Sequence, residues 1–206
     1  MPSRALLSAT ILALALNTAA ATAATPVKRR LCTVHHARTL ATVGTTRLLS
    51  RDTNIGDEYG PTTTLYGCVG RHSPRNLGEA YGIEPATLRI TPRYAAFSFR
   101  SSDVACSKYM PNDPACTTTG IRVFDLLTGR LRASAASEAQ ALVLSPRGRT
   151  AWVGFPGADG RRSVVAIDAA GQRTLATGVI DPASLVLVGE TVTFSVDGVS
   201  QSATLA

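Results

Sequence analysis

Three histidines and one carboxylate-rich segment are the first candidates for acid–base or metal chemistry in this 206-residue chain. His35 and His36 are adjacent, so on a strand their side chains point to opposite faces and only one could share a site with His72. The segment 52–58, Asp-Thr-Asn-Ile-Gly-Asp-Glu, has the oxygen density of a calcium loop, but its twelfth position is Thr63 and not an acidic ligand. We therefore interpret the histidines as surface residues and the segment as a polar turn.

Two further carboxylates, Asp125 and Asp168, end two similar strands, 121–125 and 164–168. They could form a catalytic pair, but their recurrence favours a structural role in which each bonds the backbone of the turn that follows. The sequence contains no Gly-x-Ser-x-Gly, P-loop, Gly-x-Gly-x-x-Gly or His-Glu-x-x-His motif. The catalytic residues are therefore unknown, and the sequence predicts neither a cofactor nor a metal.

The four cysteines are spaced by 36, 38 and 10 residues, without the Cys-x-x-Cys pair typical of zinc sites. If the protein is exported, as its N-terminal segment indicates below, an even number of cysteines favours two disulfides, and three pairings are possible. Cys106 and Cys116 bracket a polar, proline-rich insertion, which a short covalent ring would hold. Cys32 would then pair with Cys68 and anchor the entering chain.

The elements that must position these residues are clearest between Ala139 and Gly178. Four short apolar or β-branched runs are separated there by turn formers: Ser-Pro-Arg-Gly at 145–148, Pro-Gly-Ala-Asp-Gly at 156–160, and Ala-Gly at 170–171. This pattern predicts one antiparallel four-stranded meander. Val164 to Ile167 is apolar without alternation, which indicates a strand buried on both faces.

Similar patterns recur before and after this meander. Leu185 to Leu187 repeats Leu142 to Leu144, and Thr191-Val192 is matched with Thr150-Ala151, with Gly189 in the place of Gly148. A period of about 40 residues is typical of propeller blades. We therefore predict an all-β domain, a propeller-like stack of about four small antiparallel sheets, with a β-sandwich as the alternative. The predicted units cover residues 38–80, 83–135, 139–178 and 182–206.

The stretch Leu144 to Trp152, followed by a strand ending in Asp168 and a turn at Gly171, resembles the WD40-like propeller repeat of TolB-type proteins. Arg147 stands where that repeat has Asp. The resemblance implies a binding platform or a domain attached to a hydrolase. Trp152 lies in a repeat strand, so we expect it in the core. A closed ring, an open stack and a ring completed by a partner are all compatible with the pattern.

Residues 1–23 read as a signal peptide. Arg4 precedes an apolar run of about a dozen residues, and Ala21-Thr22-Ala23 offers a cleavage pattern. Lys28-Arg29-Arg30 lies beyond the cleavage site and opposes translocation, so a retained N-terminal membrane anchor is the alternative. The prediction is a secreted or cell-envelope protein with an N-terminal segment at 24–37, one domain at 38–206 and no membrane span after cleavage.

The chain has 21 basic and 14 acidic residues, a net charge of +7. Its arginines are scattered and not interleaved with aromatics, which argues against specific nucleic-acid binding. The sequence indicates a binding or interaction module whose partner is an unknown protein or an anionic cell-envelope polymer. An extracellular hydrolase with acidic residues on its loops is the alternative.

Overall fold

The computed structural model describes residues 32–54, 61–79, 82–102 and 117–206. Within these ranges no helix is long and apolar enough to cross a membrane. The elements are strands and two short 3-10 turns: β1 (Arg38–Val43), β2 (Thr46–Asn54), β3 (Pro61–Val69), β4 (Arg75–Glu79), η1 (Pro85–Thr87), β5 (Arg89–Ile90), β6 (Tyr94–Ser102), β7 (Thr117–Asp125), β8 (Arg130–Ala135), β9 (Ala141–Leu144), β10 (Thr150–Val153), β11 (Arg162–Asp168), β12 (Gly171–Gly178), η3 (Pro182–Ser184), β13 (Val186–Val188), β14 (Thr191–Val196) and β15 (Val199–Thr204).

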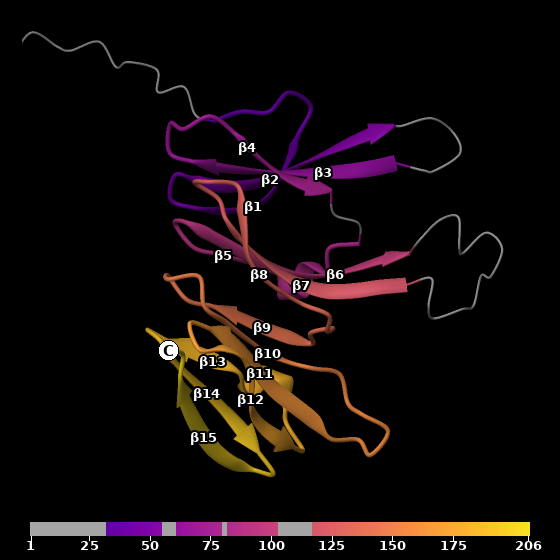
Figure 1. The fold of residues 1–206 in the computed structure, drawn as a ribbon, viewed down its shortest axis with the longest axis vertical. Helices are drawn as coiled ribbons and strands as arrows, with labels where there is room; N and C mark the ends of the chain where they lie inside the picture. The colour runs from indigo at the N-terminus through magenta and orange to yellow at the C-terminus, as the bar shows by residue number, and fades with distance from the viewer. Residues whose placement is uncertain (1–31, 55–60, 80–81, 103–116) are drawn as a thin grey trace, which may run out of the picture.

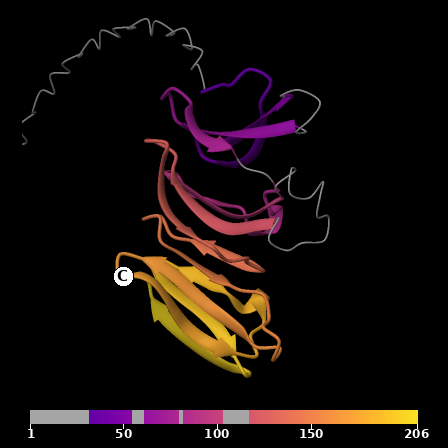
Figure 2. The ribbon, with the colours of Figure 1, turned by 45° about the vertical axis from the view of Figure 1, so that its right-hand side comes forward.

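Each sheet is an antiparallel meander of strands that follow one another in the sequence. The first sheet contains β1 to β4, the second β5 to β8, the third β9 to β12 and the fourth β13 to β15. The sheets are layered in chain order (Figures 1 and 2), and the first strands of neighbouring sheets contact one another. The predicted all-β, propeller-like stack of four antiparallel sheets is thus confirmed, whereas a β-sandwich would have two sheets.

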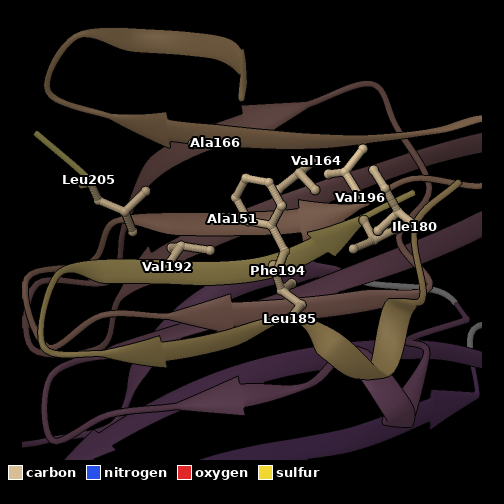
Figure 3. Packing of buried hydrophobic residues seen from close by; sticks show 10 residues of the cluster. Ala151, Val164, Ala166, Ile180, Leu185, Val192, Phe194, Val196 and Leu205 are labelled. Atoms are coloured by element: carbon tan, nitrogen blue, oxygen red, sulfur yellow. The ribbon is translucent and has the colours of Figure 1, made fainter. Parts of the chain in front are cut away.

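Apolar side chains fill the space between each pair of neighbouring sheets. Leu48 and Phe97 lie between the first and second sheets, and Trp152 lies between the second and third. Figure 3 shows the cluster between the third and fourth sheets, in which Phe194 packs among aliphatic side chains. Burial of these side chains is the main force that holds the sheets together.

The strand β11 packs against a neighbouring sheet on both faces, fully buried on one and partly buried on the other, as its unbroken apolar run predicts. Val164 and Ala166 belong to the cluster shared with the fourth sheet, and Val165 and Ile167 pack on the cluster shared with the second. This pattern follows from the stacking, because the third sheet has a neighbour on each side.

The register corrects one detail of the predicted repeat. Leu144 pairs with Thr150 in the third sheet, whereas Leu187 pairs with Val192 in the fourth. The counterpart of Thr150 is therefore Val192, and the match of Thr191-Val192 with Thr150-Ala151 is wrong by one residue. A shift of one residue turns a side chain to the other face of the sheet. Val192 and Phe194 lie on the face of β14 that is buried against the third sheet, and this burial determines how β14 pairs with β13.

The connections into β5 and β13 share a pair of side-chain hydroxyl hydrogen bonds that the sequence did not predict. Thr87 Oγ1 accepts a hydrogen bond of 3.0 Å from the backbone N–H of Ser98, and Ser184 Oγ accepts one of 2.9 Å from Ser195. Both hydroxyls also donate to a carbonyl three residues earlier in their own 3-10 turn. The similar segments 84–88 and 181–185, Glu-Pro-Ala-Thr-Leu and Asp-Pro-Ala-Ser-Leu, therefore hold the first strand of each sheet against its second.

The outer face of the first sheet is covered by the segment that precedes β1. Cys32 and Cys68 form a disulfide, the pair expected from the sequence, and both are buried with Leu49. The guanidinium of Arg47 also donates a hydrogen bond to the carbonyl of Cys32. The predicted partners Cys106 and Cys116 lie outside the described residues.

Candidate binding surface

The hairpin turns that follow the first and third strands of the sheets form one edge of the stack, on the left in Figure 1. Within the described residues, ten arginines lie in these turns or within three residues of them, but Arg47 is bonded to the carbonyl of Cys32 and Arg89 to the carbonyls of Ala86 and Leu88. The other eight form one surface. We call this surface the arginine edge: Arg71, Arg75, Arg93, Arg130, Arg132, Arg147, Arg149 and Arg173.

Most of the described acidic residues lie away from the arginine edge. In the described part of the chain, three carboxylates accompany the arginine edge: Asp125, Asp168 and Glu190. The other seven lie at or toward the opposite edge: Asp52, Glu79, Glu84, Glu138, Asp159, Asp181 and Asp197. The stack is therefore electrically polarised, with its positive side along the arginine edge.

Three arginines of this edge are tied to its carboxylates. Arg93 contacts Asp125 at 2.7 Å, Arg173 contacts Asp168 at 2.7 Å, and Arg149 contacts Glu190 at 3.4 Å. Arg147 is 70% exposed and lies 4.0 Å from Glu190. The paired arginines position the turns.

The other four arginines of the edge point into solvent. Among the described residues, Arg71, Arg130 and Arg132 are exposed and have no carboxylate partner. Arg75 is also exposed, and its Nε donates to the carbonyl of Leu127 at 3.2 Å. These side chains are available to external anions.

Asp125 and Asp168 act on the turn backbone. Oδ1 of Asp125 accepts hydrogen bonds from the backbone N–H of Leu127 and Thr128, and Oδ1 of Asp168 accepts one from Ala170. Burial raises the pKa of both carboxyls, but the guanidinium and backbone hydrogen bonds outweigh it, and each pKa lies below its ordinary value of 3.8. Both groups are therefore charged structural anchors of the arginine edge.

We expect the free energy of unfolding to fall as the pH is lowered from about 5 to below 4. The folded pKa of both carboxyls lies below the unfolded value, so their contribution is complete above the unfolded pKa and is lost as they become protonated. Urea unfolding at several pH values measures this slope. The double variant Asp125→Asn, Asp168→Asn should be less stable at neutral pH and should show a flatter slope. If the free energy of unfolding of the double variant depended on pH as strongly as that of the unmodified protein, the acid sensitivity would come from other groups.

The β9–β10 turn shapes a small depression in the arginine edge. Its volume is about 240 Å³, and Arg132, Arg147 and Arg149 contribute to its walls. Gly148 has φ of +80°, and a Cβ there would lie 2.9 Å from the Tyr94 ring. Glycine is thus required by conformation and by space. Gly189 has φ of +62° in the corresponding turn of the fourth sheet.

A larger groove of about 770 Å³ lies at the opposite edge, between the second and third sheets. Glu84 and Glu138 line it together with the half-exposed Phe155. Glu138 is already bound to Arg100 at 2.7 Å. His72 lies in the β3–β4 turn of the arginine edge, so the groove does not bring it together with these carboxylates. Within the described residues, no three His, Cys, Asp or Glu side chains are grouped to hold a metal.

The remaining candidate residues are dispersed. The His35 and His36 rings contact each other edge to face in the segment before β1. Asp52 accepts a hydrogen bond of 2.8 Å from Thr63, across β2 and β3, and the intervening part of the suspected calcium loop lies outside the described residues. Trp152 is fully buried, which leaves it no role in ligand stacking.

Sequence reasoning treated the arginines as scattered and missed the arginine edge. A signal was present in three turns of the form Ser/Thr-Pro-Arg, at 73–75, 91–93 and 145–147. These tripeptides are far apart in the chain, but they occupy turns of three consecutive sheets. Because the sheets are stacked, these three separate tripeptides lie along one edge of the molecule.

No protein-family model and no curated protein matches this chain. Among solved structures, the chain is similar to the β-propeller domain of the Trilobed protease from Pyrococcus furiosus, which is reported to have an open velcro topology. The two are 14% identical, with a TM-score of 0.45. The match covers 77% of this chain and 48% of that one, so it spans about half the length of the solved structure.

Proposed function

We propose that this protein is an exported, propeller-like binding module that holds a polyanionic partner, such as an acidic cell-envelope polymer, on its arginine edge. The observation that carries the proposal is the separation of charge: among the described residues, the edge holds eight arginines with three carboxylates, and the rest of the stack holds eight arginines with seven carboxylates. The Leu144 to Trp152 repeat supports a distant relation to TolB-type WD40-like propellers, whose repeats serve as platforms.

The chemistry of arginine suits this role. Guanidinium groups donate paired hydrogen bonds to phosphate, sulfate and carboxylate groups. Exposed charges interact weakly one at a time, at about 0.2–1 kcal/mol each. A partner with repeated negative charges would contact several arginines at once, and the positive field of the edge would attract it over a Debye length of about 10 Å at 0.1 M salt.

The test is a comparison of two triple variants with the same change in net charge. Replacing Arg71, Arg130 and Arg132 by Gln removes three exposed cations of the edge, and replacing Arg38, Arg89 and Arg161 by Gln removes three elsewhere. With heparin as the polyanionic probe, we expect the edge variant to bind roughly 10- to 100-fold more weakly at low salt. The control variant should bind nearly as well as the unmodified chain. Equal losses in both variants would mean that net charge alone governs binding.

The hydrolase alternative has less support. It requires an acid or base that is free to act, and Glu138 of the groove is engaged with Arg100. Measuring the binding of an uncharged oligosaccharide to a Glu84→Gln variant would test whether the groove takes a substrate.

Export is supported by the signal-peptide pattern and by the Cys32–Cys68 disulfide, because disulfides persist in oxidising compartments. Protein from the culture medium should then begin at Ala24 or Thr25 on N-terminal sequencing. Recovery of an intact Met1 from the cytosol would overturn this part of the proposal.

A further inference from the structure

The free edges of the first three sheets are protected against pairing with another strand. Their fourth strands, β4, β8 and β12, each contain an extra residue that interrupts the register: Leu77, Arg132 and Leu175. Each of these strands also carries at least one arginine. Bulges and charges are the usual means by which edge strands avoid intermolecular pairing.

The strand β15, at the edge of the fourth sheet, has neither protection. All six of its residues pair with β14 without a register shift. Its sequence, Val-Ser-Gln-Ser-Ala-Thr, contains no charge, proline or glycine. Among the described residues, no strand pairs with its outer edge.

The hydrogen-bond pattern shows which backbone groups face outward. The N–H of Leu205 donates to the carbonyl of Glu190 at 2.9 Å, which fixes the alternation along β15. By that alternation, the backbone N–H and C=O of Ser200 and Ser202 point away from β14. The carbonyl of Thr204 is already bound by Arg173 at 2.9 Å. Ala206 bonds to Ala169 and Asp168, so the chain leaves β15 toward the β11–β12 turn.

We propose that β15 pairs antiparallel with β15 of a second copy of this chain, about a two-fold axis at Gln201. Ser200 then lies opposite Ser202 of the partner subunit, and the two exchange both backbone hydrogen bonds. The edge is self-complementary because the outward N–H and C=O groups of Ser200 face those of Ser202 in the other copy. The side chains of β15 are uncharged, so the two copies do not repel each other. The fourth sheets of the two subunits join into one sheet of six strands.

The charges at the two ends of β15 favour the antiparallel arrangement. Arg173, which is also paired with Asp168 at 2.7 Å, lies beside Thr204 at one end of the strand, and Asp197 lies in the β14–β15 turn at the other. Antiparallel pairing brings Arg173 toward Asp197 of the partner subunit. Parallel pairing would place like charges together. A neutral strand with opposite charges near its two ends thus fits its own copy in a two-fold symmetric dimer.

Cysteine cross-linking tests this geometry directly. On the proposed axis, Gln201 forms a non-hydrogen-bonded pair with its own copy, with a Cα–Cα distance of about 4.5 Å, which suits a disulfide. Val199 would lie opposite Ala203 of the partner subunit, and the two copies of Val199 would be separated by roughly 14 Å along the strands. Under mild oxidation, Gln201→Cys should therefore give disulfide-linked dimers. Val199→Cys and the unmodified chain should not.

Sedimentation of the unmodified chain over a range of concentrations supplies the second measurement. Ser202→Pro removes an outward N–H that β14 does not use, so we expect it to weaken dimerisation at least tenfold, and Ser202→Ala should leave it unchanged. A thermal melt establishes that the proline variant is folded. A monomer at every concentration, or equal cross-linking at positions 199 and 201, would overturn the proposal. Neither result depends on the polyanion, so this test is independent of the proposed function.

Discussion

Trp152→Ala is expected to lower the free energy of unfolding by roughly 3–5 kcal/mol. The indole is fully buried between the second and third sheets, and its Nε1 donates a hydrogen bond of 3.2 Å to Ser137. Truncation removes apolar contacts with both sheets and leaves a cavity that the paired strands on either side cannot close. The measurement is urea unfolding followed by far-UV circular dichroism, because Trp152 is the chain's single tryptophan and the variant has no tryptophan fluorescence.

Two variants control this result. Trp152→Phe keeps an aromatic ring in the layer and should cost less than the alanine variant. Phe155→Ala removes an aromatic side chain that is 52% exposed, only three residues away, and should cost less than about 1 kcal/mol. Similar losses for Trp152→Ala and Phe155→Ala would contradict the packing described between the second and third sheets.

Replacing both Cys32 and Cys68 by Ser is expected to cost about 2–4 kcal/mol. The disulfide closes a loop with a sequence separation of 36 residues, so its removal gives the unfolded chain more freedom. It also frees the segment that covers Leu49 on the outer face of the first sheet. Guanidinium unfolding of the oxidised protein and of the double variant measures the difference.

The reduced, unmodified protein provides the control for this experiment. Its stability should approach that of the double serine variant, whereas a reductant should have a much smaller effect on the variant itself. A variant as stable as the oxidised protein would show that the covering segment is held by packing and by the Arg47 hydrogen bond alone. The pairing of Cys106 with Cys116 stays a prediction, and peptide mapping without reduction would test it.

The sequence was most informative where turn chemistry and strand composition agreed. Ser145-Pro146-Arg147-Gly148 and Ala170-Gly171 predict the hairpins of the third sheet, and both turns are found there. The two-faced apolar run at 164–167 correctly indicated a sheet with neighbours on both sides. These features are local, and short windows of sequence carry them.

What the sequence did not show depends on the stacking of distant segments. Thr191 and Val192 both suit a strand, and only the face buried against the third sheet decides the register between them. The arginine edge likewise arises because turns about 40 residues apart are placed side by side by the repeat. No short window contains it, although the three Ser/Thr-Pro-Arg turns pointed toward it.

The sequential order of the meanders has a consequence for how the molecule is made. Among the described residues, each sheet is formed by strands that follow one another in the chain, and no strand passes from one sheet into another. Such local pairing favours fast folding, because little loop entropy is lost before the contacts form. If the protein is exported as proposed, with its N-terminus first, the first sheet can close while the later sheets have not yet left the translocation pore. Each new meander would then find an apolar face already in place to condense upon.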